Sequence, residues 1–148
     1  GVTAPEDALR IKSTGADAVY VSNHGGRQLD SVPAAIDLIG PIREAVGREY
    51  PLAFDSGVRD AEDILKAFAC GANFVMLGRP NLFALAADGA AGLESLYAAL
   101  RYDLSVAMAQ IGVETIGQIG YHNLSQDTQM MTAHTDAAAS AKAKGKKP

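Results

Sequence analysis

The stretch AVYVSNHGGRQLDS, at positions 18–31, decides the fold. It joins a short apolar run, 18–21, to a polar loop that holds His24, two glycines and Arg27. A buried strand that ends in such a loop is how an α/β barrel presents its chemistry. His24 can take or give a proton near neutral pH, and the planar fork of Arg27 matches a carboxylate. The combination, more than either residue alone, indicates a site where a small acid loses a proton next to its carboxylate.

Composition excludes several classes of protein. The chain has 148 residues, 48% of them hydrophobic, which is enough for one domain with its own core. A net charge of −4 argues against a nucleic-acid partner, and no run of about 18 apolar residues offers a membrane span. The single cysteine, Cys70, excludes an intramolecular disulfide and favours the cytoplasm. The chain starts at Gly1 without a methionine, so we expect it to be part of a longer protein.

Short apolar runs alternate with helical patterns along residues 1–124. This rhythm predicts parallel strands covered by helices, in either an open doubly wound sheet or a segment of a (β/α)8 barrel. Pro41 is expected to kink or interrupt the second helix. Residues 125–148, which end in a lysine-rich run, are expected to form a flexible tail. The expected strands are 17–22, 51–54 and 74–77, all buried, and the expected helices are 3–15, 33–46, 60–71, a short one through 85 and a long one over 89–111.

The second and third strands end alike. DSGVR at 55–59 and GR at 78–79 each place a glycine and an arginine between a strand and a helix. Free backbone N–H groups, a helix N-terminus and a guanidinium together make a phosphate site. In (β/α)8 barrels this site commonly follows the last two strands, beside a short extra helix. The predicted fold is therefore α/β, the carboxy-terminal portion of a (β/α)8 TIM barrel, with its last three strands and their helices.

The loop SNHGGRQLD, at 22–30, resembles the active-site loop of the FMN-dependent α-hydroxy acid oxidases and dehydrogenases, the family of glycolate, lactate and mandelate oxidising enzymes. The segments at 55–59 and 77–80 resemble its two FMN-phosphate segments, and the resemblance covers residues 1–124. It implies oxidation of a small L-2-hydroxy acid, with His24 removing a proton and Arg27 binding the substrate carboxylate. It implies no metal. The residues that it assigns to FMN, with Asp55 against the ribityl chain, are Asp55, Ser56, Gly57, Arg59, Gly78 and Arg79.

Other parts of that family's site are expected to lie outside this chain. A lysine that supports the flavin would fall just before Gly1, and the aspartate that orients the histidine belongs to the amino-terminal half. We therefore expect the chain to be inactive alone and to need the missing half of its barrel, in a full-length protein that is a homo-oligomer. Membrane association is not encoded here, although a peripheral membrane location stays open for the full-length protein.

Two other functions remain open from the sequence. One is a non-catalytic half-barrel remnant that binds phosphate or flavin and acts through self-association, because an open strand edge and an uncovered apolar face promote association. The other is a different FMN barrel, such as an isomerase, which would leave His24 and Arg27 unexplained.

Overall fold

A computed structural model describes residues 1–125 of the chain. The predicted tail lies outside the described residues, apart from Ser125. Four helices, three strands and three short 3-10 turns follow one another along these residues. They are α1 (Pro5–Ser13), β1 (Val19–Val21), η1 (His24–Gly26), α2 (Ala35–Val46), β2 (Leu52–Phe54), α3 (Ala61–Ala69), β3 (Phe74–Val75), α4 (Arg79–Gln110), η2 (Ile116–Gln118) and η3 (Tyr121–Asn123).

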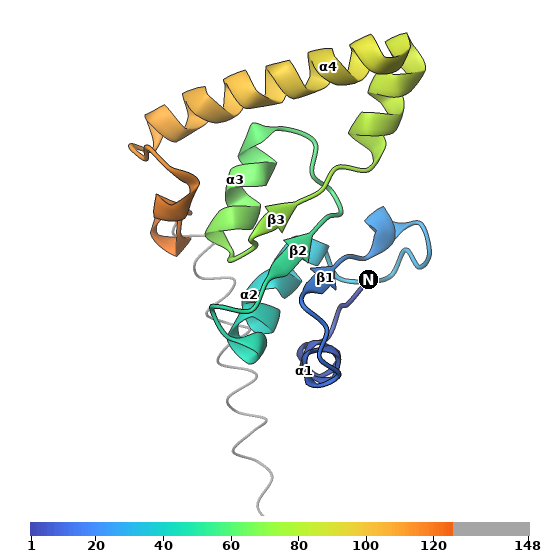
Figure 1. The fold of residues 1–148 in the computed structure, drawn as a ribbon, viewed down its shortest axis with the longest axis vertical. Helices are drawn as coiled ribbons and strands as arrows, with labels where there is room; N and C mark the ends of the chain where they lie inside the picture. Colours follow the sequence, from blue (N-terminus) through green and yellow to red (C-terminus); the bar gives the residue numbers. More distant parts are fainter. Residues whose placement is uncertain (126–148) are drawn as a thin grey trace, which may run out of the picture.

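The three strands form one parallel sheet in the order β1-β2-β3 (Figure 1). On the outer side of β1, Val2 pairs with Val21 in the parallel direction, and its N–H donates to the Tyr20 carbonyl at 2.9 Å. The amino terminus of the chain therefore runs beside β1 as extended backbone. Sequential parallel strands joined by helices are the βα rhythm that the sequence predicts.

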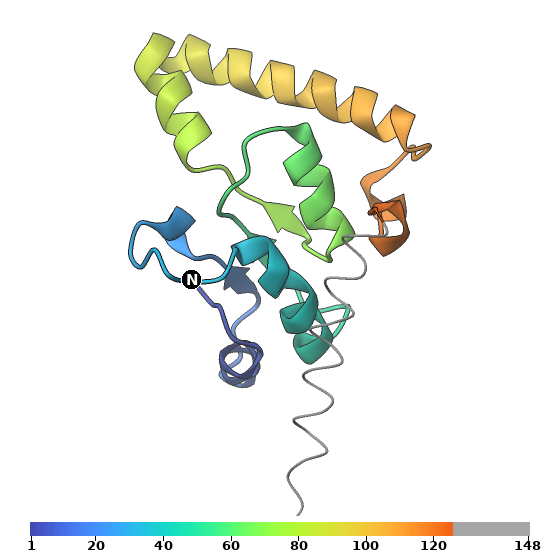
Figure 2. The ribbon, with the colours of Figure 1, turned by 180° about the vertical axis from the view of Figure 1, so that it is seen from behind.

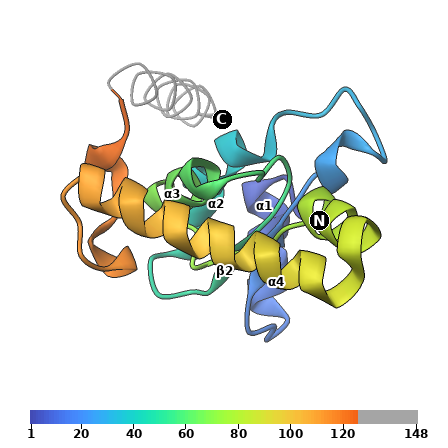
Figure 3. The same cartoon turned by 90° about the horizontal axis from the view of Figure 1, so that it is seen from above.

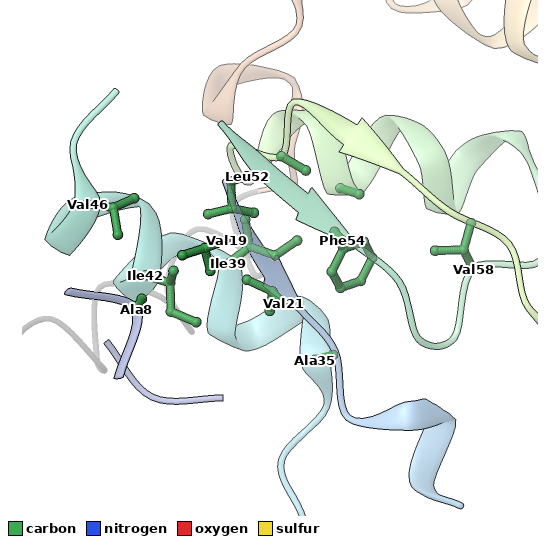
Figure 4. Close-up of a cluster of buried hydrophobic side chains, with 12 residues drawn as sticks. Ala8, Val19, Val21, Ala35, Ile39, Ile42, Val46, Leu52, Phe54 and Val58 are labelled. Carbon is green, nitrogen blue, oxygen red and sulfur yellow. The ribbon is translucent and has the colours of Figure 1, made fainter. Parts of the chain in front are cut away.

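Helix α2 covers one face of the sheet (Figure 2), and the core lies between them. Val19 and Val21 of β1 are buried, as is Ile39 on the apolar face of α2 (Figure 4). Burial of each such side chain contributes roughly 1.5–3 kcal/mol. This packing also explains why the expected interruption at Pro41 is wrong: α2 continues through Pro41, because Ile39 and Ile42 on either side are fully buried and hold the helix against the sheet.

The other face of the sheet is open. The strand register places Tyr20, Ala53 and Phe74 side by side, opposite to the buried valines. Tyr20 is 39% exposed and Phe74 is 60% exposed. The expectation that the third strand is buried is therefore wrong, because β3 is an edge strand and no element within residues 1–125 covers this face of Phe74.

The expected break between a short and a long helix is confirmed. Within the helical stretch Arg79–Gln110 the backbone leaves helical angles at Asp88 and Gly89. Gly89 has a φ of +51°, which a glycine adopts without strain. The chain turns sharply there, and the long second part passes over α3 (Figures 1 and 3). Among the described residues, no helix combines the length and apolarity that a membrane crossing requires.

Candidate active site

A pocket of about 560 Å³ opens at the carboxyl ends of the strands. It lies between the His24 loop, the loop after β2 and the start of α4. Residues from three separate parts of the sequence therefore meet in one place. All eight predicted site residues line it, namely His24, Arg27, Asp55, Ser56, Gly57, Arg59, Gly78 and Arg79.

Three arginines of this pocket form no polar contact with their side chains within residues 1–125. Across residues 1–125, the guanidinium groups of Arg27, Arg59 and Arg79 form no hydrogen bond and no ion pair. Arg79 reaches toward the His24 loop, since a methyl group on Gly25 would lie 3.1 Å from its Nη2 atom. Arginine forks bind carboxylates and phosphates in a planar, bidentate way. Three free guanidiniums around one pocket indicate an anionic ligand.

The two helices that follow these loops begin differently. At α3, the Asp60 carboxylate accepts the N–H of Asp63 at 2.9 Å, and the Asp63 carboxylate accepts the N–H of Arg59 at 3.0 Å. Asp60 is therefore the N-cap of α3. At α4, Gly78 is the N-cap residue and no side chain caps the helix. Pro80 has no N–H, and the Asn81 N–H donates to the Gly78 carbonyl at 3.1 Å, so the Arg79 N–H and the positive dipole end of α4 are left for a ligand.

Gly57, in the loop after β2, leaves open space in the pocket that the start of α4 also lines. Gly57 has a φ of +86°, and nothing in residues 1–125 lies within 4 Å of the position a Cβ would take. A side chain there would be strained, whereas glycine lets the backbone approach a ligand closely.

His24 stands in a tightly held turn. Its φ of +55° is in the left-handed region, which a non-glycine residue adopts only under constraint. The constraint comes from the side chain of Asn23. Its Oδ1 accepts the N–H of Gly25 at 2.9 Å, and its Nδ2 donates to the Pro33 carbonyl at 3.0 Å. The ring is therefore presented at the pocket by a rigid loop.

Asp55 is the acidic residue of the pocket. Tyr20 donates to its Oδ2 at 2.6 Å, and Ser56 donates to its Oδ1 at 2.8 Å. Burial alone would raise the pKa of Asp55, but hydrogen bonds from Ser22, Tyr20 and Ser56, with nearby His24, hold this pKa below its usual value. Burial, followed by the hydrogen bond and charge of Asp55, raises the pKa of Tyr20 to about 12. The Asp55 side chain is thus an ionised carboxylate whose position is held by two hydrogen bonds.

Sequence reasoning missed Tyr20 and Ser22 as members of this site. The alternation of side chains along β1 could have separated Tyr20 from the buried valines. Its contact with Asp55, 35 residues away, depends on the strand register. Cys70 lies outside this pocket, and burial, with the charge of Asp37, raises its pKa to about 11, in line with an inert thiol. No cluster of three potential metal ligands occurs in the part of the chain that the structure describes.

Comparison with known families identifies the chain. Residues 1–126 match the family described as FMN-dependent dehydrogenase. The chain belongs to this family. It is 43% identical to the L-lactate oxidase of Lentilactobacillus hilgardii over 119 residues, 80% of this chain and 32% of that protein. It is also 43% identical to an L-lactate dehydrogenase of Xanthomonas oryzae pv. oryzae over 129 residues, 87% of this chain and 33% of that protein.

Solved structures of the family share this fold. A monotopic membrane protein, (S)-mandelate dehydrogenase, superposes with a TM-score of 0.81 and 39% identity over 84% of this chain and 33% of its own. A mandelate oxidase solved with a monooxide FMN adduct gives 0.76 and 43% identity over 79% of this chain and 37% of its own. The prediction of a partial α/β barrel is confirmed. The chain spans about a third of the length of the relatives it matches.

Proposed function

We propose that this chain supplies part of the active site of an enzyme that binds FMN and oxidises a small L-2-hydroxy acid to the 2-keto acid. One observation carries the proposal. Three guanidiniums that have no partner within residues 1–125 lie in the same pocket as His24 and Asp55. Lactate and mandelate oxidising enzymes are among the relatives, and both acids carry a carboxylate beside a hydroxyl-bearing carbon.

The residues present fit the FMN phosphate. Arg59 and Arg79 supply positive charge, and Gly57, Gly78 and the uncapped start of α4 supply backbone N–H groups and open space. These are the components of a phosphate site at a helix N-terminus. We assign the phosphate to them. FMN, when bound, supplies the two-electron acceptor of the reaction.

Asp55 completes the proposed cofactor wall. Because hydrogen bonds keep Asp55 ionised, its carboxylate can accept hydrogen bonds from the ribityl hydroxyls. Ser56 lies on the same loop and lines the pocket beside it.

His24 and Arg27 act on the substrate in this proposal. Arg27 binds the substrate carboxylate with its planar fork, which fixes the carbon that carries the hydroxyl. His24 accepts the proton that the substrate loses, from the α-carbon or from the hydroxyl. The left-handed turn at His24 places its backbone at the edge of the pocket before the substrate arrives.

The proposed partner is the remainder of the barrel. Phe74, Met76 and Phe83 are 46–69% exposed and lie at the open edge or beside the pocket. Their cover would come from the two thirds of the relatives that this chain does not match. We place the complete enzyme in the cytoplasm as a homo-oligomer, with a peripheral membrane location as the alternative that (S)-mandelate dehydrogenase exemplifies.

The same exposed apolar face supports a second candidate function. A non-catalytic half-barrel that binds phosphate or flavin and associates with its own kind would use Phe74 and Met76 as its interface. The outcome that would distinguish it is a stable dimer of the chain that binds FMN, with no hydroxy acid able to reduce the bound FMN.

The test is anaerobic addition of L-lactate, glycolate or (S)-mandelate to the FMN-loaded full-length protein, because this chain alone is expected to be inactive. One of these acids should bleach the visible flavin absorbance. His24→Ala should retain FMN and slow bleaching by at least about 100-fold, the usual contribution of a general base. Arg27→Ala should raise the acid concentration needed for half the maximal rate. Bleaching at the wild-type rate in His24→Ala would contradict the proposal.

A further inference from the structure

Ser56 occupies a position where its backbone would suit a glycine. Its φ is +87°, in the left-handed region where L side chains are strained. Of the described residues other than glycine, only His24 and Ser56 have positive φ, and both line the same pocket. A serine in a conformation that glycine adopts freely suggests that its hydroxyl is used.

The Ser56 hydroxyl has a complete set of partners within the chain. Its proton goes to Oδ1 of Asp55 at 2.8 Å. Its oxygen accepts the N–H of Asn23 at 3.2 Å and the N–H of Gly25 at 3.1 Å. A serine hydroxyl offers one donor and two acceptor positions. These three bonds therefore leave no regular position for a ligand, and the 3.4 Å contact with Ser22 Oγ is too long to compete.

The two N–H groups that Ser56 accepts lie on either side of His24. They fix the Ser22–Asn23 and His24–Gly25 peptides, on the two sides of the strained turn. The His24 N–H itself goes to Ser22 Oγ at 3.1 Å. One hydroxyl from the loop after β2 thus grips the loop after β1 at both flanks of the histidine.

We propose that Ser56 is a positioning residue whose hydroxyl links the Asp55 carboxylate to the backbone on both sides of His24 and so fixes the catalytic loop. It acts on the His24 backbone and does not hold FMN through its hydroxyl. The proposal thereby deepens the proposed function and rests on it for the catalytic role of His24. The grip on the loop can be tested without any ligand.

Amide hydrogen exchange of the chain, followed by NMR without FMN, is the first test. The reporter is the Asn23 amide, because Ser56 Oγ is its hydrogen-bond acceptor within residues 1–125, whereas the Gly25 amide is also held by Asn23 Oδ1. Ser56→Gly removes the hydroxyl and relieves the backbone strain. It should speed Asn23 exchange at least about tenfold. The Asp55 and Met76 amides, bonded to strand carbonyls, should be unchanged.

Ser22→Ala is the matched control, because it removes the other hydroxyl of the cluster. It should speed exchange of the His24 amide and leave that of Asn23 unchanged. Ser56→Ala, which keeps the strain, should affect Asn23 in the same way as Ser56→Gly. An unprotected Asn23 amide in the wild-type chain, or one that Ser56→Gly leaves unchanged, would overturn the proposal.

FMN separates this proposal from the proposed function. In the full-length protein, Ser56→Gly should leave the Kd for FMN within about twofold and lower the rate of flavin reduction by the hydroxy acid about tenfold, as expected when a catalytic group is less well placed. A large loss of FMN affinity with unchanged Asn23 exchange would make the hydroxyl a flavin ligand and overturn the positioning role. If wild type binds no FMN, the proposed function fails while the exchange pattern still decides the role of Ser56.

Discussion

The two ends of the parallel sheet use arginine in opposite ways. Near the amino ends of β2 and β3, the guanidinium of Arg43 donates hydrogen bonds to neighbouring loops. At the carboxyl ends, the guanidiniums of Arg27, Arg59 and Arg79 form no hydrogen bond and no ion pair within residues 1–125. The acceptors of Arg43 are the carbonyls of Gly47, Arg48, Tyr50 and Gly71 and the side chain of Asn73.

This difference separates stability from function. A guanidinium that forms hydrogen bonds through all three of its nitrogens, as in Arg43, fastens loops together, whereas the guanidiniums around the pocket are available to a ligand from outside. The same division is typical of α/β barrels, in which the amino end of the sheet stabilises the fold and the carboxyl end carries the chemistry. Substitutions at the two ends should therefore have opposite signatures.

The largest effect should come from Arg43→Ala. It leaves carbonyls of two loops without their donor, so the free energy of unfolding should fall by about 3 kcal/mol, as for loss of a hydrogen-bonded charged group. Urea denaturation measures this. Arg48→Ala, an exposed neighbour, should change it by less than about 0.5 kcal/mol. Equal losses of stability in the two variants would contradict the claim that the hydrogen bonds of Arg43 stabilise the fold.

A smaller effect should separate the starts of α3 and α4. Asp60→Ala removes a side-chain cap and should cost about 1 kcal/mol of stability. Gly78→Asp places a carboxylate at the uncapped start of α4, so it should cost little stability but weaken FMN binding through charge repulsion. Denaturation and FMN titration of both variants provide the check. A Gly78→Asp variant that binds FMN as tightly as wild type would contradict the assignment of the α4 start to the phosphate.

Much of the fold and the site could be predicted from local sequence. The apolar run at 18–21, the Asp60 cap and the break near Gly89 depend on nearest neighbours, and the structure bears them out. The convergence of residues around His24 and Arg79 follows from parallel strands, whose carboxyl ends share one edge.

Features set by distant contacts could not be predicted in this way. The exposure of Phe74 reflects which strands flank β3, and local pattern carries no information on that. The bonds of Arg43 to Gly71 and Asn73, and the Tyr20 contact with Asp55, join segments 28–35 residues apart. The role of Ser56 depends on backbone angles that the letters alone do not fix.

The smallest predicted effect concerns Tyr20, whose phenol donates to Asp55 within the pocket. Its pKa of about 12 lies above the ordinary value near 10, so the protonated phenol stabilises the fold below pH 10. This contribution should disappear as the pH rises from 10 to 12. Alkaline absorbance titration of wild type minus Tyr20→Phe isolates the group, and Asp55→Asn should lower its midpoint. A difference signal complete near pH 10 would exclude the Tyr20–Asp55 bond in solution.

FMN titration of the chain, followed by quenching of flavin fluorescence, tests the central claim most directly. The open arginines predict saturable quenching that weakens at least about tenfold in Arg59→Ala and in Arg79→Ala, the loss expected for one charge-assisted contact. Arg101→Ala, on the exposed side of α4, should bind FMN as wild type does. Quenching that is absent, or that is equally strong in all four proteins, would contradict the claim that the carboxyl end of this sheet is built for the FMN phosphate.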